Sequence, residues 1–410
     1  MTYPFGFVVL LLLFSINAVA HEGTVIDAAS RKPLDGALVT LDNTVVKTDQ
    51  NGRFQIAGKG DILGVRAAGH ARRSVAANTT EPIELAPLIP KALYLSFYGV
   101  GTKVLRNAAL ELIAGTELNA LVVDIKGDRG MVSIKSSTTL AAEVGAQKII
   151  TVKDIKALVG SLHEKGIYTV ARIVVFKDDP LARAKPDLAV KTSAGKVWQD
   201  REKLAWVNPF NQTVWNYNID LAVEAAKAGF DEIQFDYVRF PDAPDLVFSQ
   251  PNTEPNRVAA VSGFLARARE RLIPYNVFLA ADVFGYVAWN IDDTGIGQKL
   301  GDMTRHLDYI SLMLYPSGFQ FGIPGISNPV EHPDQIVART LERARQRTGW
   351  PPSRFRPWLQ AFRDYAFGRV PFGGAQVRAQ IDAAEAFGSD GWMLWNPRNV
   401  YSRDGLRPKR

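Results

Sequence analysis

The sequence of 410 residues contains no cysteine. This absence excludes disulfides, thiolate zinc sites, iron–sulfur clusters and cysteine nucleophiles. Histidine is also scarce, and the five that occur do not have the spacing of metal ligands. The adjacent carboxylates at 178–179 and 292–293 could bind calcium, although such pairs more often solvate a surface loop. The sequence therefore predicts a protein that uses neither a metal nor another cofactor.

Long apolar runs are equally few. The most marked covers 5–16, which is about the length of a signal-peptide core and too short to cross a bilayer comfortably. Ala18-Val19-Ala20 follows it with the small-x-small pattern of a cleavage site. We expect a signal peptide over 1–20, cleavage before His21, export to the periplasm or the extracellular space, and a soluble mature chain. An uncleaved anchor is the alternative, which the shortness of the run disfavours.

The chain also lacks a concentrated charge of one sign. Its 48 Lys and Arg exceed its 42 Asp and Glu by six, and the excess gathers only in the tail 407–410. A balance this diffuse argues against a nucleic-acid partner. Attraction to acidic polymers or surfaces stays open, and with it a peripheral association with the cell envelope. The sequence does not predict the oligomeric state.

Residues 21–86 have the pattern of a small β domain. Short apolar runs such as 36–41 and 54–56 are separated by turn signals, including Asp49-Gln50-Asn51-Gly52, and leave too little room for helices. This pattern predicts a small antiparallel sandwich. Prolines at 82, 87 and 90 exclude a helix there, and we place a linker at 87–91.

Four segments of this part resemble the carboxypeptidase regulatory-like domain, a transthyretin-type sandwich. They are 23–27 (GTVID), 33–37 (PLDGA), 48–54 (TDQNGRF) and 65–70 (VRAAGH). His70 stands where that family usually has Tyr or Phe. The resemblance implies a spacer or an adhesion platform, so we assign this domain no chemistry.

Residues 92–410 alternate between strand-like and helix-like segments. Eight β-rich apolar runs fall at 93–98, 119–125, 168–176, 231–238, 277–283, 308–315, 354–361 and 390–395. Amphipathic helical stretches fall at 104–116, 152–165, 212–228, 256–273, 295–305, 333–348 and 375–387. One of them should be capped by Thr151 with Asp154 three residues on. Eight buried strands separated by helices predict a (β/α)8 TIM barrel, an α/β fold, without its eighth helix. A doubly wound sheet is the alternative, but no G-x-G-x-x-G follows the first strand.

Chemistry in such a barrel lies at the carboxyl ends of the strands and in the loops that follow them. The candidates there are Tyr98, Asp124, Lys126, Asp128, Arg172, Lys177, Asp178, Trp206, Asn208, Gln234, Asp236, Arg239, Asp282, Tyr315, Gln360, Trp395 and Asn396. Carboxylates, amides and aromatic rings at one mouth are what sugar chemistry needs, because two carboxyl groups act on the bond while amides and rings hold the sugar.

Six ordered segments of the barrel resemble the putative glycoside hydrolase domain family of bacterial envelope proteins, which is distantly similar to α-amylase-like barrels. They are 118–126 (LNALVVDIK), 172–178 (RIVVFKD), 206–209 (WVNP), 229–241 (GFDEIQFDYVRFP), 282–285 (DVFG) and 394–396 (LWN). The resemblance implies a glycoside hydrolase that acts on an envelope or extracellular polysaccharide. The aromatic, amide and basic residues among the candidates above would then bind the substrate.

The resemblance to α-amylase-like barrels further implies that Asp236 is the nucleophile and Asp282 the proton donor. Two positions differ from the amylase pattern, since Gln234 stands where amylases have Arg and Asp282 where they have Glu. The shorter side chain of Asp282 loses one methylene of reach. Asp124 is therefore the reserve for either catalytic role.

Other interpretations remain open at this stage. Asp236 could simply form an ion pair with Arg239, and a degenerate barrel could bind polysaccharide as a scaffold without cutting it. An esterase would need a Ser–His pair or a metal triad, and the sequence shows no motif for either. The aromatic residues in the long loops 177–210 and 315–332 could form sugar subsites or pin the loops to the barrel.

Overall fold

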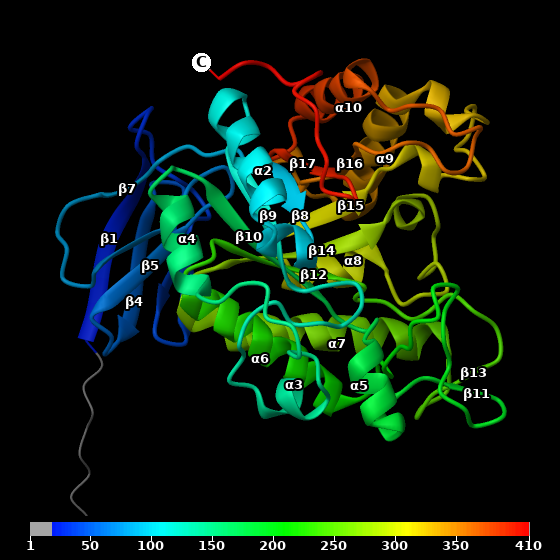
Figure 1. Cartoon of the computed structure of the whole chain (residues 1–410). Helices are drawn as coiled ribbons and strands as arrows, with labels where there is room; N and C mark the ends of the chain where they lie inside the picture. The colour runs from blue at the N-terminus through cyan, green and yellow to red at the C-terminus, as the bar shows by residue number, and fades with distance from the viewer. Residues whose placement is uncertain (1–18, 410) are drawn as a thin grey trace, which may run out of the picture.

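The computed structural model describes residues 19–409, which form a β-sandwich followed by a closed α/β barrel (Figure 1). One sheet of the sandwich has three strands in the order β4-β1-β7, and the other has four in the order β3-β2-β5-β6. The bounds are β1 (Val19–Asp27), β2 (Leu38–Leu41), β3 (Thr44–Lys47), β4 (Arg53–Gly58), β5 (Ile62–Arg66), β6 (Arg73–Ala76) and β7 (Ile83–Leu85). The small β domain is thus present, although β1 pairs with β7 in parallel rather than antiparallel.

Alternation along the strands explains the sandwich core. In β4 the side chains of Phe54 and Ile56 are buried while their neighbours are exposed. The turn before β4 forms as predicted, because the Oδ1 of Asp49 accepts bonds of 2.8 Å from the amides of Asn51 and Arg53. Gly52 in this turn has φ of +71°, and a Cβ there would lie 2.4 Å from a backbone oxygen of β1. Only glycine fits this position.

Eight parallel strands close the barrel in the order β8-β9-β10-β12-β14-β15-β16-β17, and β17 pairs with β8. Their bounds are β8 (Lys91–Leu95), β9 (Ala120–Lys126), β10 (Tyr168–Val174), β12 (Glu232–Asp236), β14 (Phe278–Phe284), β15 (Tyr309–Met313), β16 (Trp358–Gln360) and β17 (Trp392–Trp395). A two-stranded ribbon of β11 (Lys191–Thr192) and β13 (Leu246–Val247) lies in the long loops. The predicted TIM barrel is confirmed.

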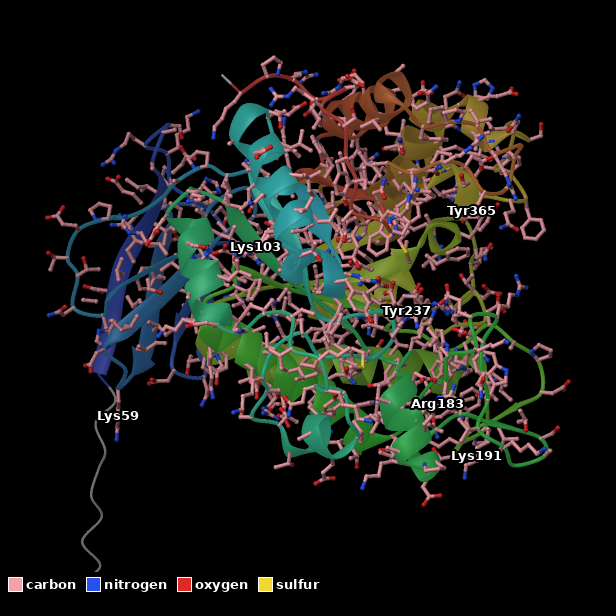
Figure 2. The ribbon with its side chains drawn as sticks, in the orientation of Figure 1. Lys59, Lys103, Arg183, Lys191, Tyr237 and Tyr365 are labelled. Atoms are coloured by element: carbon pink, nitrogen blue, oxygen red, sulfur yellow. The ribbon has the colours of Figure 1, made fainter. Side chains whose placement is uncertain are left out.

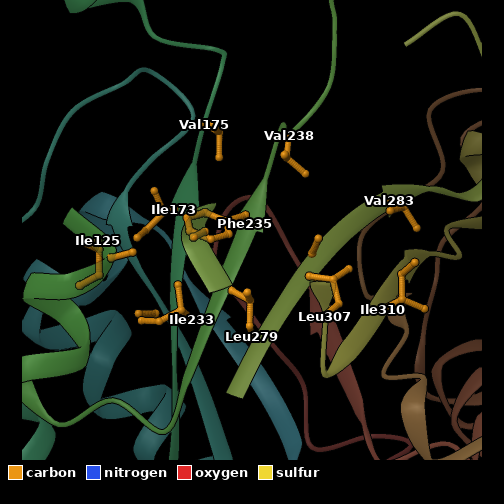
Figure 3. Close-up of a cluster of buried hydrophobic side chains, with 14 of the residues drawn as sticks. Ile125, Ile173, Val175, Ile233, Phe235, Val238, Leu279, Val283, Leu307 and Ile310 are labelled. Carbon is orange, nitrogen blue, oxygen red and sulfur yellow. The ribbon is translucent and has the colours of Figure 1, made fainter. Parts of the chain in front are cut away.

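Each barrel strand divides its side chains between two buried layers. Ile233 and Phe235 of β12 point outward into the apolar layer beneath the helices, together with residues such as Ile173 and Leu279 (Figure 3). Gln234 and Asp236 alternate with them and lie in the barrel interior, where polar side chains share the space with a second apolar cluster. This alternation brings charged side chains into the barrel and directs those at the strand ends toward the mouth.

The helices cover the barrel from outside. They are α1 (Phe97–Gly101), α2 (Lys103–Gly115), α3 (Thr139–Glu143), α4 (Ile155–His163), α5 (Asp179–Ala184), α6 (Gln212–Ala228), α7 (Glu254–Leu272), α8 (Leu300–Met303), α9 (Pro333–Thr348) and α10 (Gly374–Phe387). Within 396–409 no helix follows β17, as the sequence predicts. In the part of the chain that the structure describes, no helix combines the length and apolarity that a bilayer crossing requires.

Three local predictions were wrong. Helix α4 is capped by Asp154, whose Oδ1 accepts from the amide of Ala157 at 2.8 Å, so Thr151 is not its cap. The predicted helix 295–305 shrinks to α8 because Gly295 and Gly297 take positive φ, and Asp293 binds their amides. The seventh strand begins at Trp358 rather than at 354, since a 3-10 turn occupies Pro352–Arg354.

The sandwich packs on the amino-terminal ends of the barrel strands. The guanidinium of Arg72 donates to the carboxylate of Asp231 at 3.1 Å and to the carbonyls of Gly229 and Phe230 at 2.6 and 3.0 Å. Asn276, just before β14, donates to the carbonyls of Val65 and Arg73. The opposite end of the barrel, where the strands finish, is therefore not covered by the sandwich.

We expect Arg72→Ala to lower the free energy of unfolding by about 2 kcal/mol, because four oxygens at the seam, including the carbonyl of Tyr275, lose a charged donor. Urea unfolding followed by tryptophan fluorescence measures the change. Arg73→Ala is the matched control, since the exposed Arg73 donates only to the carbonyl of Glu84 and should cost under about 0.5 kcal/mol. Equal losses in the two variants would contradict a specific role of Arg72 in docking.

Candidate active site

Arg172, near the end of β10, lies at the centre of a buried carboxylate cluster at the mouth. Its Nη1 donates to the Oδ1 of Asp124 at 2.7 Å. Its Nη2 and Nε donate to the Oδ2 of Asp236 at 2.5 and 3.0 Å, and Nη2 also reaches the Oδ1 of Asp128 at 2.8 Å. The Oδ2 of Asp282 lies 3.9 Å from Nε. One guanidinium thus gathers four carboxyl groups from the ends of β9, β12 and β14.

Both carboxyl oxygens of Asp236 accept hydrogen bonds from fixed donors. Besides Arg172, the amide of Tyr237 donates to its Oδ1 at 2.6 Å. Tyr237 has φ of +48°, a left-handed conformation that is uncommon for a tyrosine and turns the chain sharply after β12. The strand end is therefore bent at the residue after the carboxylate.

Asp282 has the opposite environment. Its Oδ1 accepts from the indole of Trp358 at 2.8 Å, while its Oδ2 has no hydrogen-bond partner among the described residues. Burial, followed by the nearby charge of Asp236, raises the pKa of Asp282 well above its ordinary value, against the opposing effect of Arg172. Burial therefore favours the protonated form of Asp282. Its side chain is only 1% exposed.

The carboxyl oxygens of this cluster are close together. Since the Nε of Arg172 lies 3.0 Å from the Oδ2 of Asp236 and 3.9 Å from that of Asp282, these two oxygens are at most 6.9 Å apart. The shared Nη2 likewise places an Asp128 oxygen within 5.3 Å of Asp236, from its distances of 2.8 and 2.5 Å. Asp128 is the most exposed member, at 39% of its side chain.

Asp124 accepts hydrogen bonds from donors besides Arg172. Its Oδ2 accepts from the phenol of Tyr94 at 2.8 Å and from the amide of Phe97 at 3.0 Å. Burial nevertheless raises the pKa of Asp124 to about 6, and Arg172 opposes that rise. Asp124 would therefore exchange a proton close to neutral pH.

Two hollows open at the mouth. One of about 190 Å³ is lined by Asp236, Arg239, Tyr286, Tyr315 and Tyr365 among others. The second, of about 280 Å³, is lined by Asp124, Asp128, Tyr98 and Met131 among others. Tyr237 and Tyr365, which line the first hollow, lie on the side of the barrel away from the sandwich (Figure 2). Asp282 lines neither hollow.

Several of the predicted site residues come together here. Tyr315 and Arg239 line the first hollow, and Tyr98, 55% exposed, lines the second. Trp395 stacks on Tyr94 with ring centroids 4.0 Å apart and lies 4.8 Å from the Arg172 guanidinium. These positions are compatible with the predicted contacts to substrate.

Lys126 does not reach the mouth. Its ammonium is buried between the barrel and α6, where it pairs with Asp178 at 2.5 Å and donates to Asn218 at 2.8 Å. The cause is a register shift between β9 and β10 at Arg172 and Ile173, which turns Lys126 outward. The two acidic pairs considered for calcium each lose a carboxylate to an ion pair, since Asp178 pairs with Lys126 and Asp293 pairs with Arg257. Among residues 19–409 no group of three or more acidic, histidine or cysteine side chains could hold a metal ion.

The predicted binding residues of the loop 177–210 instead fasten that loop. Lys177 pairs with Asp200 at 3.2 Å and with Glu202. Trp206 is buried, donates from its indole to Asp200 at 3.0 Å and packs edge-on against Tyr237. Asn208 is also buried, and its amide group donates to Ser249 at 2.9 Å.

Three predicted amides are likewise engaged inside the protein. Gln234 donates to Ser311 within the barrel at 3.2 Å. Gln360 donates to the hydroxyl of Ser317 at 2.8 Å, and Asn396 donates to two loop carbonyls at 2.7 and 2.8 Å. None of the three lines a hollow described above. These three amides form hydrogen bonds within the barrel and its loops, and their positions are not those of substrate-binding residues.

The alternative of an Asp236–Arg239 ion pair was wrong. Asp236 pairs with Arg172, whereas Arg239 lies over the rings of Trp206 and Tyr237 at 5.0 and 5.3 Å. Sequence reasoning also missed Tyr286 and Tyr365. Tyr286 follows β14 by two residues, so a slightly longer strand-end window would have included it. Tyr365 lies in the loop after β16, and no local signal marks it.

Comparisons with known proteins identify the family and the fold of the barrel. The family model described as "Putative glycosyl hydrolase domain" matches residues 92–401. A search of curated proteins gives no match. Among solved structures, a hypothetical protein from Ruminiclostridium thermocellum is 40% identical, covering 47% of this chain and 97% of that one, with a TM-score of 0.42. The glycoside hydrolase domain of PgaB (BpsB) from Bordetella bronchiseptica is 14% identical, covering 79% and 100%, with a TM-score of 0.52, and shows the same fold.

Proposed function

Because the chain belongs to the family of the putative glycosyl hydrolase domain, we propose that it cleaves glycosidic bonds in an envelope or extracellular polysaccharide. The observation that carries this proposal is the contrast between two neighbouring carboxyl groups. Asp236 accepts two hydrogen bonds from the Arg172 guanidinium, while the pKa of Asp282 is raised well above its ordinary value by burial. Glycoside hydrolysis needs one carboxyl group that gives up a proton and a second that acts as nucleophile or base.

In this mechanism Asp282 donates its proton to the glycosidic oxygen as the bond between that oxygen and the anomeric carbon breaks. Asp236 either attacks the anomeric carbon or deprotonates the attacking water, and one water molecule is consumed in total. Retention needs carboxyl groups about 5–5.5 Å apart and inversion about 6.5–9.5 Å. The upper limit of 6.9 Å is compatible with both, so NMR of the first anomer released decides the stereochemistry.

The burial of Asp282 sets a condition on the mechanism. Tyr315 lines the first hollow and lies close enough to Asp282 and Asp236 that their charges raise its pKa, after the larger effect of burial. Because Asp282 lines neither hollow, this mechanism requires a side chain at the mouth to move before the substrate can meet the acid. Asp124 is the alternative acid, since it already lines the second hollow and its pKa is raised to about 6.

The same burial favours a second candidate function, a barrel that binds polysaccharide without cutting it. Reducing-end release from a panel of bacterial exopolysaccharides and α-glucans, measured beside binding, separates the two. Cleavage of one polymer by the wild type and binding without cleavage by Asp236→Asn support hydrolysis. Binding of a polymer by the wild type with no release from any of them supports the scaffold.

We also propose that the protein is exported. Of the predicted signal peptide 1–20, residues 1–18 lie outside the described residues, and Val19 and Ala20 begin β1 opposite Gly58 and Ala57. Cleavage before His21 would shorten β1 by two residues and leave the pairs from His21 to Thr24. Amino-terminal sequencing of the protein from the periplasmic fraction should begin at His21. A start at residue 1 or 2 would contradict cleavage.

A further inference from the structure

A cavity of about 560 Å³ lies between the sandwich and the barrel, at the end of the barrel opposite the mouth. The sandwich contributes 34–36, Leu38, Lys47 and 66–68, and the barrel contributes Arg269 of α7 and the loops that precede β15 and β16. The volume is in the usual range of about 300–1,000 Å³ for ligand sites. It is separate from both hollows of the mouth, with which it shares no lining residue.

The lining is strongly basic. Five Lys and Arg side chains face two carboxylates, Asp35 and Asp308. Asp308 is already engaged, because Arg269 donates to both of its oxygens at 2.6 and 3.0 Å and the amide of Leu279 at 2.9 Å. Burial alone would raise the pKa of Asp308, but its arginine neighbours, Arg269 foremost, lower it to about 2. Asp308 therefore stays ionised. Five cations and two carboxylates leave the lining with an excess of positive charge.

Arg66, the last residue of β5, is the buried cation of this cavity. Its side chain is 3% exposed, and its Nη1 donates to Asn276 at 3.0 Å. Its Nε has no hydrogen-bond partner among residues 19–409, where the nearest Asp308 oxygen is 3.8 Å away. A buried donor without an acceptor is costly, so an oxygen supplied by a ligand would be stabilising here.

Three further cations surround the cavity. Arg354 donates to the carbonyls of Leu307 and Asp308, lies over the Trp350 ring at 4.2 Å and forms no direct ion pair within the described residues. Arg305 is 72% exposed with its nearest carboxylate at 3.8 Å. Lys47 of β3 is exposed and has no ion-pair partner in residues 19–409. Several guanidinium groups and an ammonium group that line one cavity can bind phosphate or carboxylate groups through charge-assisted hydrogen bonds.

We propose that this cavity is a binding site for a small multivalent anion that carries phosphate or carboxylate groups. Such a ligand contacts Lys47 and Arg66 from the sandwich and Arg305 and Arg354 from the barrel. Binding therefore stabilises the docked arrangement of the two parts, and it does not depend on the reaction at the mouth.

Calorimetric titration of the full chain tests this site with two probes, inorganic pyrophosphate and citrate. Lys47→Ala and Arg305→Ala should each raise the Kd about fivefold, and the pair should raise it about 25-fold. Both side chains are exposed, so the variants should fold. Lys59→Ala and Lys103→Ala are matched controls, since each removes an exposed lysine outside the cavity (Figure 2). The controls should bind as the wild type does.

A preference for pyrophosphate would identify a phosphate ligand, and a preference for citrate a carboxylate ligand. The wild type should also gain a few degrees of Tm with the bound probe, whereas Arg66→Met should not. Two results overturn the proposal. One is the absence of binding for both probes at roughly 10 mM. The other is an equal loss of affinity in the control variants, which would indicate a diffuse charge effect.

Discussion

Asp236→Asn is expected to lower kcat/KM for polysaccharide cleavage about 10³- to 10⁴-fold while the Kd for the polymer changes little. The amide can neither attack the anomeric carbon nor accept a proton from water. Arg172 keeps its bonds to Asp124 and Asp128, so the mouth should hold its shape. Reducing-end release gives the rate, and binding of the same polymer gives the Kd.

Asp128→Asn is the matched control for Asp236→Asn. Asp128 shares the Nη2 of Arg172 with Asp236 but lies at the exposed edge of the cluster. The Asp128→Asn variant should lower kcat/KM less than about tenfold, because Arg172 loses only an exposed partner. Should Asp236→Asn cut as fast as the wild type, Asp236 is structural and Asp124 becomes the next carboxylate to test.

Asp282→Asn is expected to lower kcat about 10²- to 10⁴-fold and to remove the alkaline limb of the pH profile. The neutral form of Asp282 is the active acid, so wild-type activity should fall as pH rises through its raised pKa. Asn cannot titrate, so the residual rate should lack that limb. A wild-type profile between pH 4 and 10, repeated for each variant, is the measurement. If Asp124 is the acid instead, Asp124→Asn loses the limb and Asp282→Asn keeps it.

The stability of Asp282→Asn provides an independent readout. A carboxyl group whose pKa is raised by folding contributes stability below its unfolded pKa of about 4, and that contribution is lost as pH rises through the folded value. The wild type should therefore lose stability with rising pH in a way that the Asn variant does not. The amide oxygen can still accept from Trp358, so the variant should fold. A parallel pH dependence in both proteins would mean that Asp282 is already ionised.

Much of the barrel could be predicted because its periodicity is strong. Helix α6 matches its predicted bounds 212–228, since Asn211 caps its start and Gly229, with φ of +108°, ends it. The predicted fold and glycosyl hydrolase family are confirmed. The carboxypeptidase regulatory-like resemblance of the sandwich and the α-amylase-like relationship of the barrel stay predictions.

The site was harder to predict than the fold because side-chain direction depends on register. The strand-end rule places Arg172 and Asp236 at the mouth, where they lie. It fails for Lys126, because one irregular step beside Arg172 reverses the face on which the next residue emerges. Nor could the loop partners of Trp206 and Lys177 be foreseen, since Asp200 meets them only after the loop has folded back.

The position of the sandwich also sets the direction from which the protein can work. It is attached to one end of the barrel through Arg72 and Asn276, while the carboxylate cluster faces the other end. If the sandwich bound a surface, that surface would lie at the end of the barrel opposite the mouth, and the mouth would face away from it. Polymer chains that extend away from such a surface, rather than those lying flat against it, would have unobstructed entry.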